Sequence, residues 1–354
     1  MNLQLDRITV VAGGRKILDG VSTTVEKGDF CALIGPTGCG KTTLLRIMDL
    51  LAKPSSGRVL LDGEECTRSR GRKRTALRRR MSMVMQRPFM LAGTVERNVG
   101  FGLSVRGIRP TAGRIAGALE SVGLSGMGKR NARTLSGGEM QKVAIARAVV
   151  TEPELLLLDE PLTSVDQGFK PELRSLIGRL HREMGITVVM ATHDLADALV
   201  LSSKTVVMSE GRVMQDGDTP EVFNNPSGLF VASFIGMKNI FQAEFREEEA
   251  RVGDISITIT GRRSGAGYIH IPQEAITLSP RRPESSQRNA FEGEITEVLP
   301  TPLHDEVHVK TGGVVLQSSV TRESVSNLGL TPGARVWASF KATSVKVLSR
   351  PSPD

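Results

Sequence analysis

The stretch GPTGCGKTT at residues 35–43 constrains this chain more than any other part of its sequence. It follows the apolar run DFCALIG (29–35) and precedes a helical pattern, so it predicts a strand, a glycine-rich loop and a helix. Glycines let backbone N–H groups point inward at phosphate oxygens, and the following helix presents its positive end. Lys41 is expected to supply a point charge to the β and γ phosphates, and the Thr42 hydroxyl is expected to be a Mg²⁺ ligand. The residues predicted to bind phosphate are Gly35, Pro36, Thr37, Gly38, Cys39, Gly40, Lys41, Thr42 and Thr43.

Adjacent acids follow another apolar run, LLLLDEP at 155–161. Asp159 is expected to emerge at the carboxyl edge of the sheet, where it serves with Thr42 as a Mg²⁺ ligand. Glu160 beside it is placed to polarise a water for in-line attack on a γ-phosphate. The alternative for these acids is a solvated strand end without chemistry.

Short apolar runs alternate with helical patterns up to about residue 236, which is typical of an α/β fold with a largely parallel sheet covered on both faces. The opening stretch 3–29 alternates apolar and polar residues instead, so we expect an antiparallel β layer before the first parallel strand. Buried strands are expected at 29–35, 81–86, 155–159, 187–192 and 205–209, and helices near 41–51, 94–105, 111–122, 138–150 and 171–183.

The motif LSGGEMQ (135–141) lies between the phosphate loop and the acids. In this order the motifs closely resemble the ABC ATPase family, and the resemblance covers about residues 1–236. It implies a P-loop nucleotide-binding domain with a helical subdomain that holds the signature. It also implies a homodimer in which each ATP lies between one chain's phosphate loop and the partner's signature. Ser136, Gly137 and Gly138 lead into a helix and offer a hydroxyl and N–H groups to a γ-phosphate; taken alone, they would indicate a helix N-cap.

The same resemblance assigns roles to further residues. Gln86 matches the family's Q-loop glutamine, which senses Mg²⁺ and water and lies near the permease contact. His193 in MATHD matches the switch histidine that contacts the γ-phosphate. Asp166 belongs to SVD (164–166), which resembles the D-loop that connects the two sites, with Val165 in place of the more usual Ala. The implied catalytic set is therefore Glu160, His193, Gln86 and Lys41, and the implied metal set is Thr42, Gln86 and Asp159.

One position departs from the family pattern. The aromatic residue that usually stacks on adenine is replaced, by spacing, with Ala12, and Gly13 and Gly14 follow. Loss of this stacking costs about 1–3 kcal/mol by analogy with base–aromatic contacts. Our hypothesis is that base discrimination is weak and that GTP substitutes for ATP.

Beyond residue 236 the pattern changes to short alternating strands broken by Gly, Pro and Asn, which is typical of a small β-barrel or sandwich. We therefore expect domains at 1–236 and 237–354, with a loop at 279–289 in the second. This region resembles the small OB-like barrel, called TOBE, of import ATPases, and 320–348 is similar to the version in molybdate and tungstate importers.

The resemblance suggests two roles for this second domain. Thr321, Ser324, Lys341 and Thr343 are candidates to hydrogen-bond a regulatory oxyanion that inhibits transport in a replete cell. The alternative is a barrel that only holds the dimer together.

Charge and cysteine content narrow the class of protein. The net charge is +8, and a basic run at 68–80 contributes much of it, either as a contact for nucleic acid or lipid headgroups or as a solvated helix face. Aromatic residues make up 4%, which argues against a single-strand nucleic-acid platform, so no nucleic acid is expected. Cys31, Cys39 and Cys66 lack metal-ligand spacing and are typical of reduced thiols in the cytoplasm.

No stretch reaches the roughly 18 apolar residues that cross a bilayer, so the resemblance implies a separate permease. We expect an ATP- and Mg²⁺-dependent importer ATPase on the cytoplasmic face of the membrane, linked indirectly to an extracytoplasmic solute-binding protein. Segment 86–110 resembles the segment that receives the permease, and its Phe89, Met90 and Leu91 form either an apolar docking patch or part of the core packing. Molybdate or tungstate is the expected solute. Importers of sulfate, iron, polyamine or sugar, and a non-transport ABC ATPase acting on a nucleic-acid complex, are the alternatives.

Overall fold

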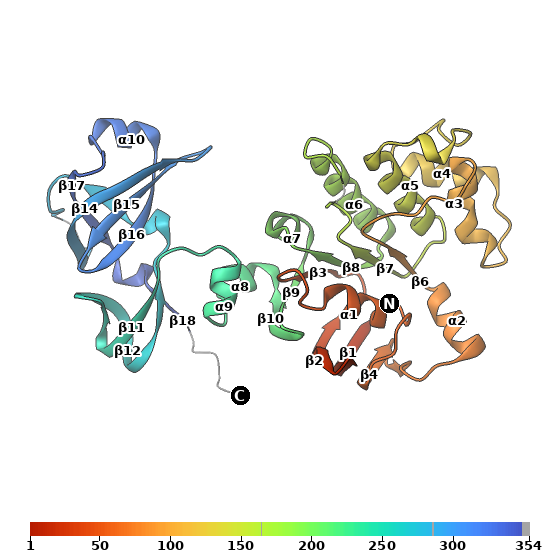
Figure 1. The fold of residues 1–354 in the computed structure, drawn as a ribbon, viewed down its shortest axis with the longest axis horizontal. Helices are drawn as coiled ribbons and strands as arrows, with labels where there is room; N and C mark the ends of the chain where they lie inside the picture. Colours follow the sequence, from red (N-terminus) through yellow and green to blue (C-terminus); the bar gives the residue numbers. More distant parts are fainter. Residues whose placement is uncertain (164, 285–286, 349–354) are drawn as a thin grey trace. The chain divides into compact units, whose positions relative to one another are not determined.

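The computed structural model describes residues 1–163, 165–284 and 287–348 (Figure 1). The chain divides into two compact units, Met1–Asn224 and Asn225–Asp354. The predicted boundary at 236 follows α9 (Leu229–Phe234), a short helix of the second unit. Ser164 of the predicted D-loop lies outside the described residues.

The first unit is built on a sheet of strand order β10-β9-β3-β8-β7-β6. The pairs from β9 to β6 are parallel, and β10 is an antiparallel edge strand, which confirms the predicted α/β class. The strands are β3 (Phe30–Ile34), β6 (Met81–Val84), β7 (Leu155–Asp159), β8 (Thr187–Thr192), β9 (Lys204–Ser209) and β10 (Arg212–Asp218).

The leucines of β7 show why its apolar run is continuous. Leu155 and Leu157 pack toward an apolar cluster shared with the N-terminal strands and the helix after the phosphate loop. Leu156 and Leu158 point to the other face, where they join a second cluster formed with the remaining helices. Successive side chains of a strand alternate between the two faces of a sheet, so a strand that is covered on both faces is apolar at nearly every position.

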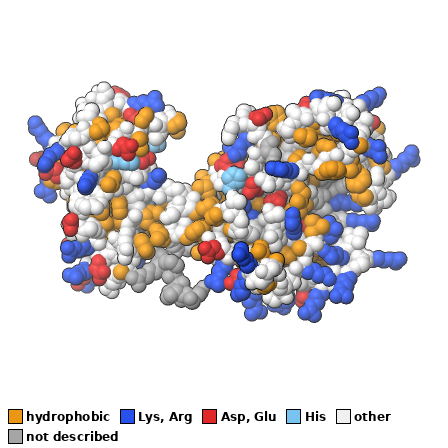
Figure 2. Space-filling model, viewed as in Figure 1, with side chains coloured by type: hydrophobic (Ala, Val, Ile, Leu, Met, Phe, Trp, Pro, Cys, Tyr) orange, Lys and Arg blue, Asp and Glu red, His pale blue; other side chains and the backbone are white. Residues whose placement is uncertain are grey.

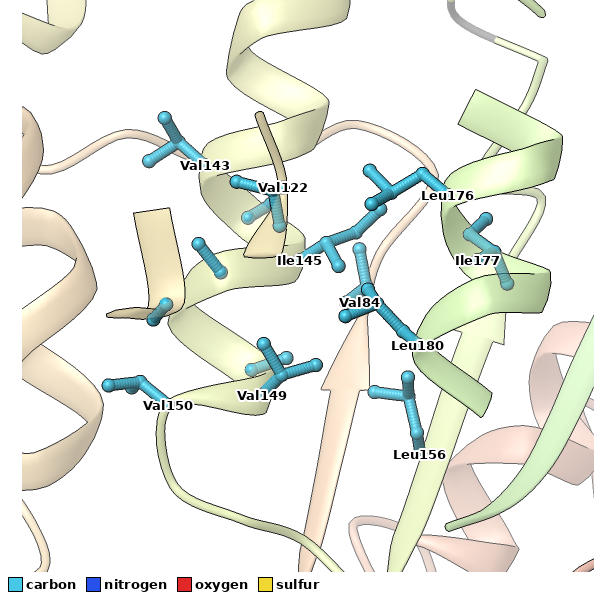
Figure 3. Packing of buried hydrophobic residues seen from close by; sticks show 14 of the residues in the cluster. Val84, Val122, Val143, Ile145, Val149, Val150, Leu156, Leu176, Ile177 and Leu180 are labelled. Atoms are coloured by element: carbon cyan, nitrogen blue, oxygen red, sulfur yellow. The ribbon is translucent and has the colours of Figure 1, made fainter. Parts of the chain in front are cut away.

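Helices cover both faces of this sheet. Figure 3 shows Val84 and Leu156 of the strands packed beside Ile145 and Val149 of α5 and Leu180 of α6. The helices are α1 (Lys41–Met48), α2 (Gly71–Arg79), α3 (Val95–Ser104), α4 (Ala112–Ser121), α5 (Gly137–Val149), α6 (Lys170–Met184), α7 (Leu195–Leu201) and α8 (Thr219–Asn224), with a 3₁₀ turn, η1 (Ala132–Thr134).

The sequence pattern missed α7 and α8, because helices of six or seven residues do not repeat an apolar face. Most of the basic run forms α2, in which Leu77 is the buried residue.

The predicted antiparallel layer is present as a sheet of order β2-β1-β4-β5. Its strands are β1 (Leu3–Ala12), β2 (Arg15–Val25), β4 (Ser56–Leu61) and β5 (Glu64–Glu65). Leu3 and Leu5 of β1 are buried in the same apolar cluster as α1, so this layer covers the phosphate-loop helix.

The second unit is mainly antiparallel β, as predicted, around a single apolar cluster that includes Ile257, Val309 and Phe340. One sheet has the order β11-β12-β18 and the other β13-β17-β14-β15-β16. The strands are β11 (Ile240–Val252), β12 (Ile255–His270), β13 (Thr277–Ser279), β14 (Asn289–Pro300), β15 (Asp305–Thr311), β16 (Val314–Val320), β17 (Arg335–Phe340) and β18 (Lys346–Leu348). Short helical turns are η2 (Gln273–Ala275), α10 (Arg322–Asn327) and η3 (Ala342–Ser344).

Strand β11 was not predicted, because its centre, REEE at 246–249, is exposed and charged and gives no alternation. The expected loop at 279–289 lies between β13 and β14, and residues 285–286 within it are outside the described part of the chain. No helix in the described ranges is long and apolar enough to cross a membrane.

Candidate active site

The phosphate loop follows β3 and ends where α1 begins at Lys41. Gly35 has φ +154, and a Cβ there would lie 2.3 Å from the Met208 carbonyl oxygen. Gly40 has φ +105, and a Cβ there would lie 2.7 Å from the Leu18 side chain. Both glycines are therefore required by their backbone conformation and by the close packing of neighbouring strands.

Lys41 is buried and holds the loop from within. Its Nζ donates hydrogen bonds to the carbonyl oxygens of Gly35, at 2.7 Å, and Pro36, at 3.0 Å. Cys39 Sγ lies 3.9 Å from the same Nζ and is buried, so Cys39 packs behind the loop. The predicted cation thus lies at the centre of the loop, where its Nζ is bound by two loop carbonyls.

Thr42 and Asp159 meet at the start of α1 and the end of β7. Thr42 Oγ1 donates to Asp159 Oδ1 at 3.0 Å. Burial raises the pKa of Asp159, the neighbouring Glu160 raises it further, and the Thr42 hydrogen bond opposes both effects. A buried carboxylate beside a hydroxyl supplies hard oxygen ligands, the kind that Mg²⁺ prefers together with substrate phosphates.

Glu160 receives contacts from different parts of the chain at one oxygen. Gln86 Nε2 donates to Glu160 Oε2 at 3.0 Å, and Thr163 Oγ1 donates to it at 3.2 Å. His193 Nδ1 lies 3.3 Å from the same oxygen. These residues follow β6, β7 and β8, which are neighbours in the sheet, so their carboxyl ends share one edge.

The backbone of Glu160 is itself constrained. Its φ is +45, and its N–H donates to the Ala191 carbonyl of β8 at 2.9 Å. A left-handed conformation is costly for a residue with a side chain, and such residues concentrate at functional sites.

These residues line an open pocket of about 470 Å³, formed by Ile17, Thr37, Gly38, Gly40, Lys41, Thr42, Thr43, Gln86, Glu160, Thr163 and His193. Sequence reasoning missed Ile17 and Thr163. Thr163 lies three residues after Glu160 in the chain, and this short separation is the only sequence signal for its hydrogen bond to Glu160. None of these lining residues is Phe, Tyr or Trp, and Ala12 at the end of β1 is exposed.

The signature residues lie elsewhere on the same unit. Ser136, Gly137 and Gly138 are not among the residues that line this pocket. Ser136 caps α5: its hydroxyl accepts from the N–H of Glu139, whose carboxylate accepts from the N–H of Ser136. A Cβ at Gly138 would lie 2.5 Å from the Phe169 ring, so the glycine permits close packing near the predicted D-loop.

A network of ion pairs supports the segment that holds His193. Lys170 of α6 contacts Asp194, which caps α7 by accepting from the N–H groups of Ala196 and Asp197. Burial alone raises the pKa of Asp194, but the Lys170 and backbone hydrogen bonds outweigh it and lower the pKa overall. Asp197 is buried and pairs with Arg174 at 2.5 Å. The chain after the predicted D-loop is thereby fixed against the chain after His193.

Comparisons with known proteins agree with this geometry. Residues 18–163 match the family model described as ABC transporter, and residues 285–347 match the TOBE domain. The molybdate/tungstate import ATP-binding protein WtpC of Pyrococcus horikoshii is 35% identical over 333 residues, which cover 92% of this chain and 94% of that protein. The chain belongs to the ABC transporter family. It is an ATP-hydrolysing subunit of the import type.

Other members of the ABC transporter family are about as similar. The Fe(3+) ions import ATP-binding protein FbpC 1 of Rhizobium meliloti is 35% identical over 353 residues, 95% of each chain. The solved cbiO1 protein of Clostridium perfringens, part of an ABC transporter complex, has a TM-score of 0.59 at 32% identity over 63% of this chain and 90% of that chain. A dimeric ATP-binding cassette in a post-hydrolysis state with ADP and Pi has a TM-score of 0.56 at 28% identity, over 61% of this chain and 98% of that one.

Proposed function

We propose that this ABC ATPase drives import of molybdate or tungstate through a separate permease, from the cytoplasmic face of the membrane. The observation that supports this solute is the similarity to the Pyrococcus molybdate/tungstate protein, which extends over 92% of this chain and so includes both units. An extracytoplasmic protein would deliver the oxyanion to the permease.

In this proposal Glu160 polarises the attacking water, and Gln86 and His193 position its carboxylate and the γ-phosphate. The support is the convergence of both side chains on Glu160 Oε2, at 3.0 and 3.3 Å. Lys41 neutralises charge on the β and γ phosphates from inside the loop.

Thr42 and Asp159 are the proposed Mg²⁺ ligands, with Gln86 close to the metal. Within the described residues no group of three or more His, Cys, Asp or Glu forms a metal cage. That suits Mg²⁺, which uses one or two protein oxygens and completes its shell with phosphate and water. When bound, the ion would neutralise the phosphate charge that develops during hydrolysis.

We further propose that the active form is a homodimer. Ser136, Gly137 and Gly138 do not line the pocket of their own chain, so a second copy would have to bring them to the γ-phosphate. The N-terminus of α5 offers a positive dipole end for that contact. The dimeric ATP-binding cassette of similar fold supports the arrangement.

The proposed permease site is a groove of about 450 Å³ beside β6. Leu51, Met85 and Val105 line it and are exposed apolar residues, and Arg106 and Arg147 line it as well. Arg147 donates to the carbonyl of Phe89 at 2.8 Å, which places exposed Phe89 near the groove.

Met90 and Leu91, the other two residues of the predicted docking patch, make contacts within the unit. Met90 packs against the core, and the backbone of Leu91 is bound by Asn98. We propose that the groove, rather than Met90 and Leu91, receives the permease.

Regulation by an oxyanion at the second unit stays a prediction. Thr321 Oγ1 donates to Ser324 Oγ at 2.8 Å and caps α10, while Lys341 and Thr343 lie at η3. The alternative is that Thr321 and Ser324 only cap this helix.

An Fe³⁺ importer is the second candidate, favoured by the equal identity to the Rhizobium protein over 95% of both chains. The test is the cellular content of molybdenum, tungsten and iron in a deletion strain that carries wild type or Glu160→Gln. We expect molybdenum or tungsten to fall in the deletion strain and to recover only with wild type. A change in iron alone would assign the second candidate and reject the first.

A further inference from the structure

A second hollow lies on the antiparallel layer of the first unit, and the proposed function does not use it. Its volume is about 960 Å³, twice that of the nucleotide pocket. It is lined by segments of β1, by the stretch before and within β4, and by the residues that lead into α2. Figure 2 shows Lys and Arg side chains gathered on this part of the unit, where Figure 1 draws α2.

Several cations of the basic run at 68–80 form ion pairs and lie outside this hollow. Lys73 forms an ion pair with Glu64, and Arg78 forms one with Asp49. Arg80 pairs with both Asp62 and Glu154. These three side chains are engaged in ion pairs within the unit, and none of them lines the hollow.

By contrast, Lys53, Arg68 and Arg70 line the hollow, are exposed and have no ion-pair partner among the described residues. The lining contains one acid, Asp6, whose carboxylate pairs with Arg58 at 2.5 Å and with Arg7 at 3.4 Å. The hollow therefore has an excess of positive charge that the protein itself does not neutralise.

The hydroxyl groups in the hollow are also set to donate. Thr9 Oγ1 accepts from the N–H of Gly20, Ser55 Oγ from Val11, and Thr67 Oγ1 from Val59. A hydroxyl that accepts a backbone N–H keeps its own proton for another acceptor. The described contacts give these protons no acceptor within the chain, so they suit an anion in the hollow.

A strained bulge brings Arg7 to the same place. The β1–β4 register shifts between Asp6 and Thr9, and Arg7 has φ +48. Opposite it, Gly57 has φ +95, and a Cβ there would lie 2.3 Å from the Arg7 carbonyl oxygen. Bulges re-aim side chains, and strained positions concentrate at functional sites. Here the bulge adds to the lining an exposed guanidinium that shares the single Asp6 carboxylate with Arg58.

We propose that this hollow binds a small anion that carries two or more phosphoryl groups. Its volume exceeds that of a single phosphate, and its cations come from separate segments, so they match charges spread along a ligand. Guanidinium groups suit phosphate because they form paired hydrogen bonds. Nucleic acid is less suited, because the lining includes no aromatic side chain for base stacking.

The test is calorimetric titration of the full chain with inorganic tripolyphosphate while saturating ADP occupies the phosphate loop. The triple variant Lys53→Ala, Arg68→Ala, Arg70→Ala removes the unpaired cations. The matched control Lys27→Ala, Arg246→Ala, Arg251→Ala removes the same charge from exposed positions elsewhere. ATP turnover without tripolyphosphate verifies that each variant is folded.

We expect one tripolyphosphate site in the wild type, weakened at least about tenfold in the triple variant and changed less than about twofold in the control. Absence of binding, an equal loss in the control, or equally tight binding of inorganic phosphate would each overturn the proposal. Binding of a short single-stranded RNA without binding of tripolyphosphate would reassign the surface to nucleic acid and also overturn it.

Discussion

His193 Nδ1 lies 3.3 Å from Glu160 Oε2, so the chain after β8 contacts the residue that follows β7. Gln86 and Thr163 donate to the same oxygen. A carboxylate held from three directions has a defined orientation, and that orientation is what a general base requires. Glu160 is therefore the first residue to test.

Glu160→Gln should retain ATP binding but lower turnover by about 100-fold or more, because the amide cannot accept the proton of the attacking water. The variant should also accumulate as a dimer with ATP and Mg²⁺, as measured by light scattering after gel filtration. Glu152→Gln, an exposed glutamate paired with Arg114, is the matched control. A Glu160→Gln chain that hydrolyses ATP normally would contradict the assigned role.

Lys41→Ala should weaken nucleotide binding by about tenfold or more, because it removes a charged donor from the centre of the phosphate loop. Equilibrium titration with a fluorescent ATP analogue measures the effect. Lys27→Ala, an exposed lysine, should bind as wild type does. Unchanged affinity in Lys41→Ala would place the phosphates elsewhere.

Because no Phe, Tyr or Trp lines the pocket, we expect the kcat/KM values for ATP and GTP to be similar, within about tenfold. Ala12→Tyr should raise the affinity for ATP by restoring a stacking surface, whereas Val11→Tyr, one residue earlier on β1, should not. A strong ATP preference in the wild type would reject the hypothesis of weak base discrimination.

The raised pKa of Asp159 predicts a specific pH dependence. Burial favours the protonated carboxyl in the folded chain, so the fold binds the proton more tightly than the unfolded chain does. The free energy of unfolding of the nucleotide-free chain should then fall as pH rises from the ordinary pKa of an aspartate through the raised one.

Asp159→Asn removes this contribution. It should raise the midpoint of thermal unfolding at neutral pH without Mg²⁺, relative to wild type, and it should abolish Mg²⁺-dependent turnover. Asp218→Asn, at an exposed position, should change neither quantity. A lower midpoint in Asp159→Asn would show that the ionised carboxylate stabilises the fold.

Asp197→Asn should lower the free energy of unfolding by about 1–3 kcal/mol, because it weakens the charged hydrogen bond from Arg174 and removes the ion pair with Lys170, whose Nζ lies 3.8 Å from Asp197 Oδ2. It should also lower turnover through His193 while leaving nucleotide affinity close to that of wild type. Urea unfolding and steady-state kinetics measure the two effects. A loss of stability without a loss of turnover would limit this network to a structural role.

Most residues of the candidate site could be predicted from the order of strands, loops and helices along the chain. Strand, glycine loop and helix place Lys41 and Thr42, and an apolar strand places Asp159 and Glu160, since parallel strands present their carboxyl ends at one edge. Ile17 could not be predicted in the same way, because its contact with the pocket depends on how a separate β layer packs over α1.

The sequence by itself determined the fold class, because strand and loop patterns are local and their periodicity records which faces are buried. The order of its motifs, and their resemblance to the ABC ATPases, indicated the family and the candidate chemistry. The tertiary structure decided which charged side chains form ion pairs and which remain unpaired. Within one basic run Arg78 pairs with Asp49 from a distant segment, whereas Arg68 and Arg70 have no such partner and line a hollow with Lys53. Ion pairs between segments depend on distances in three dimensions, and a sequence pattern does not contain those distances.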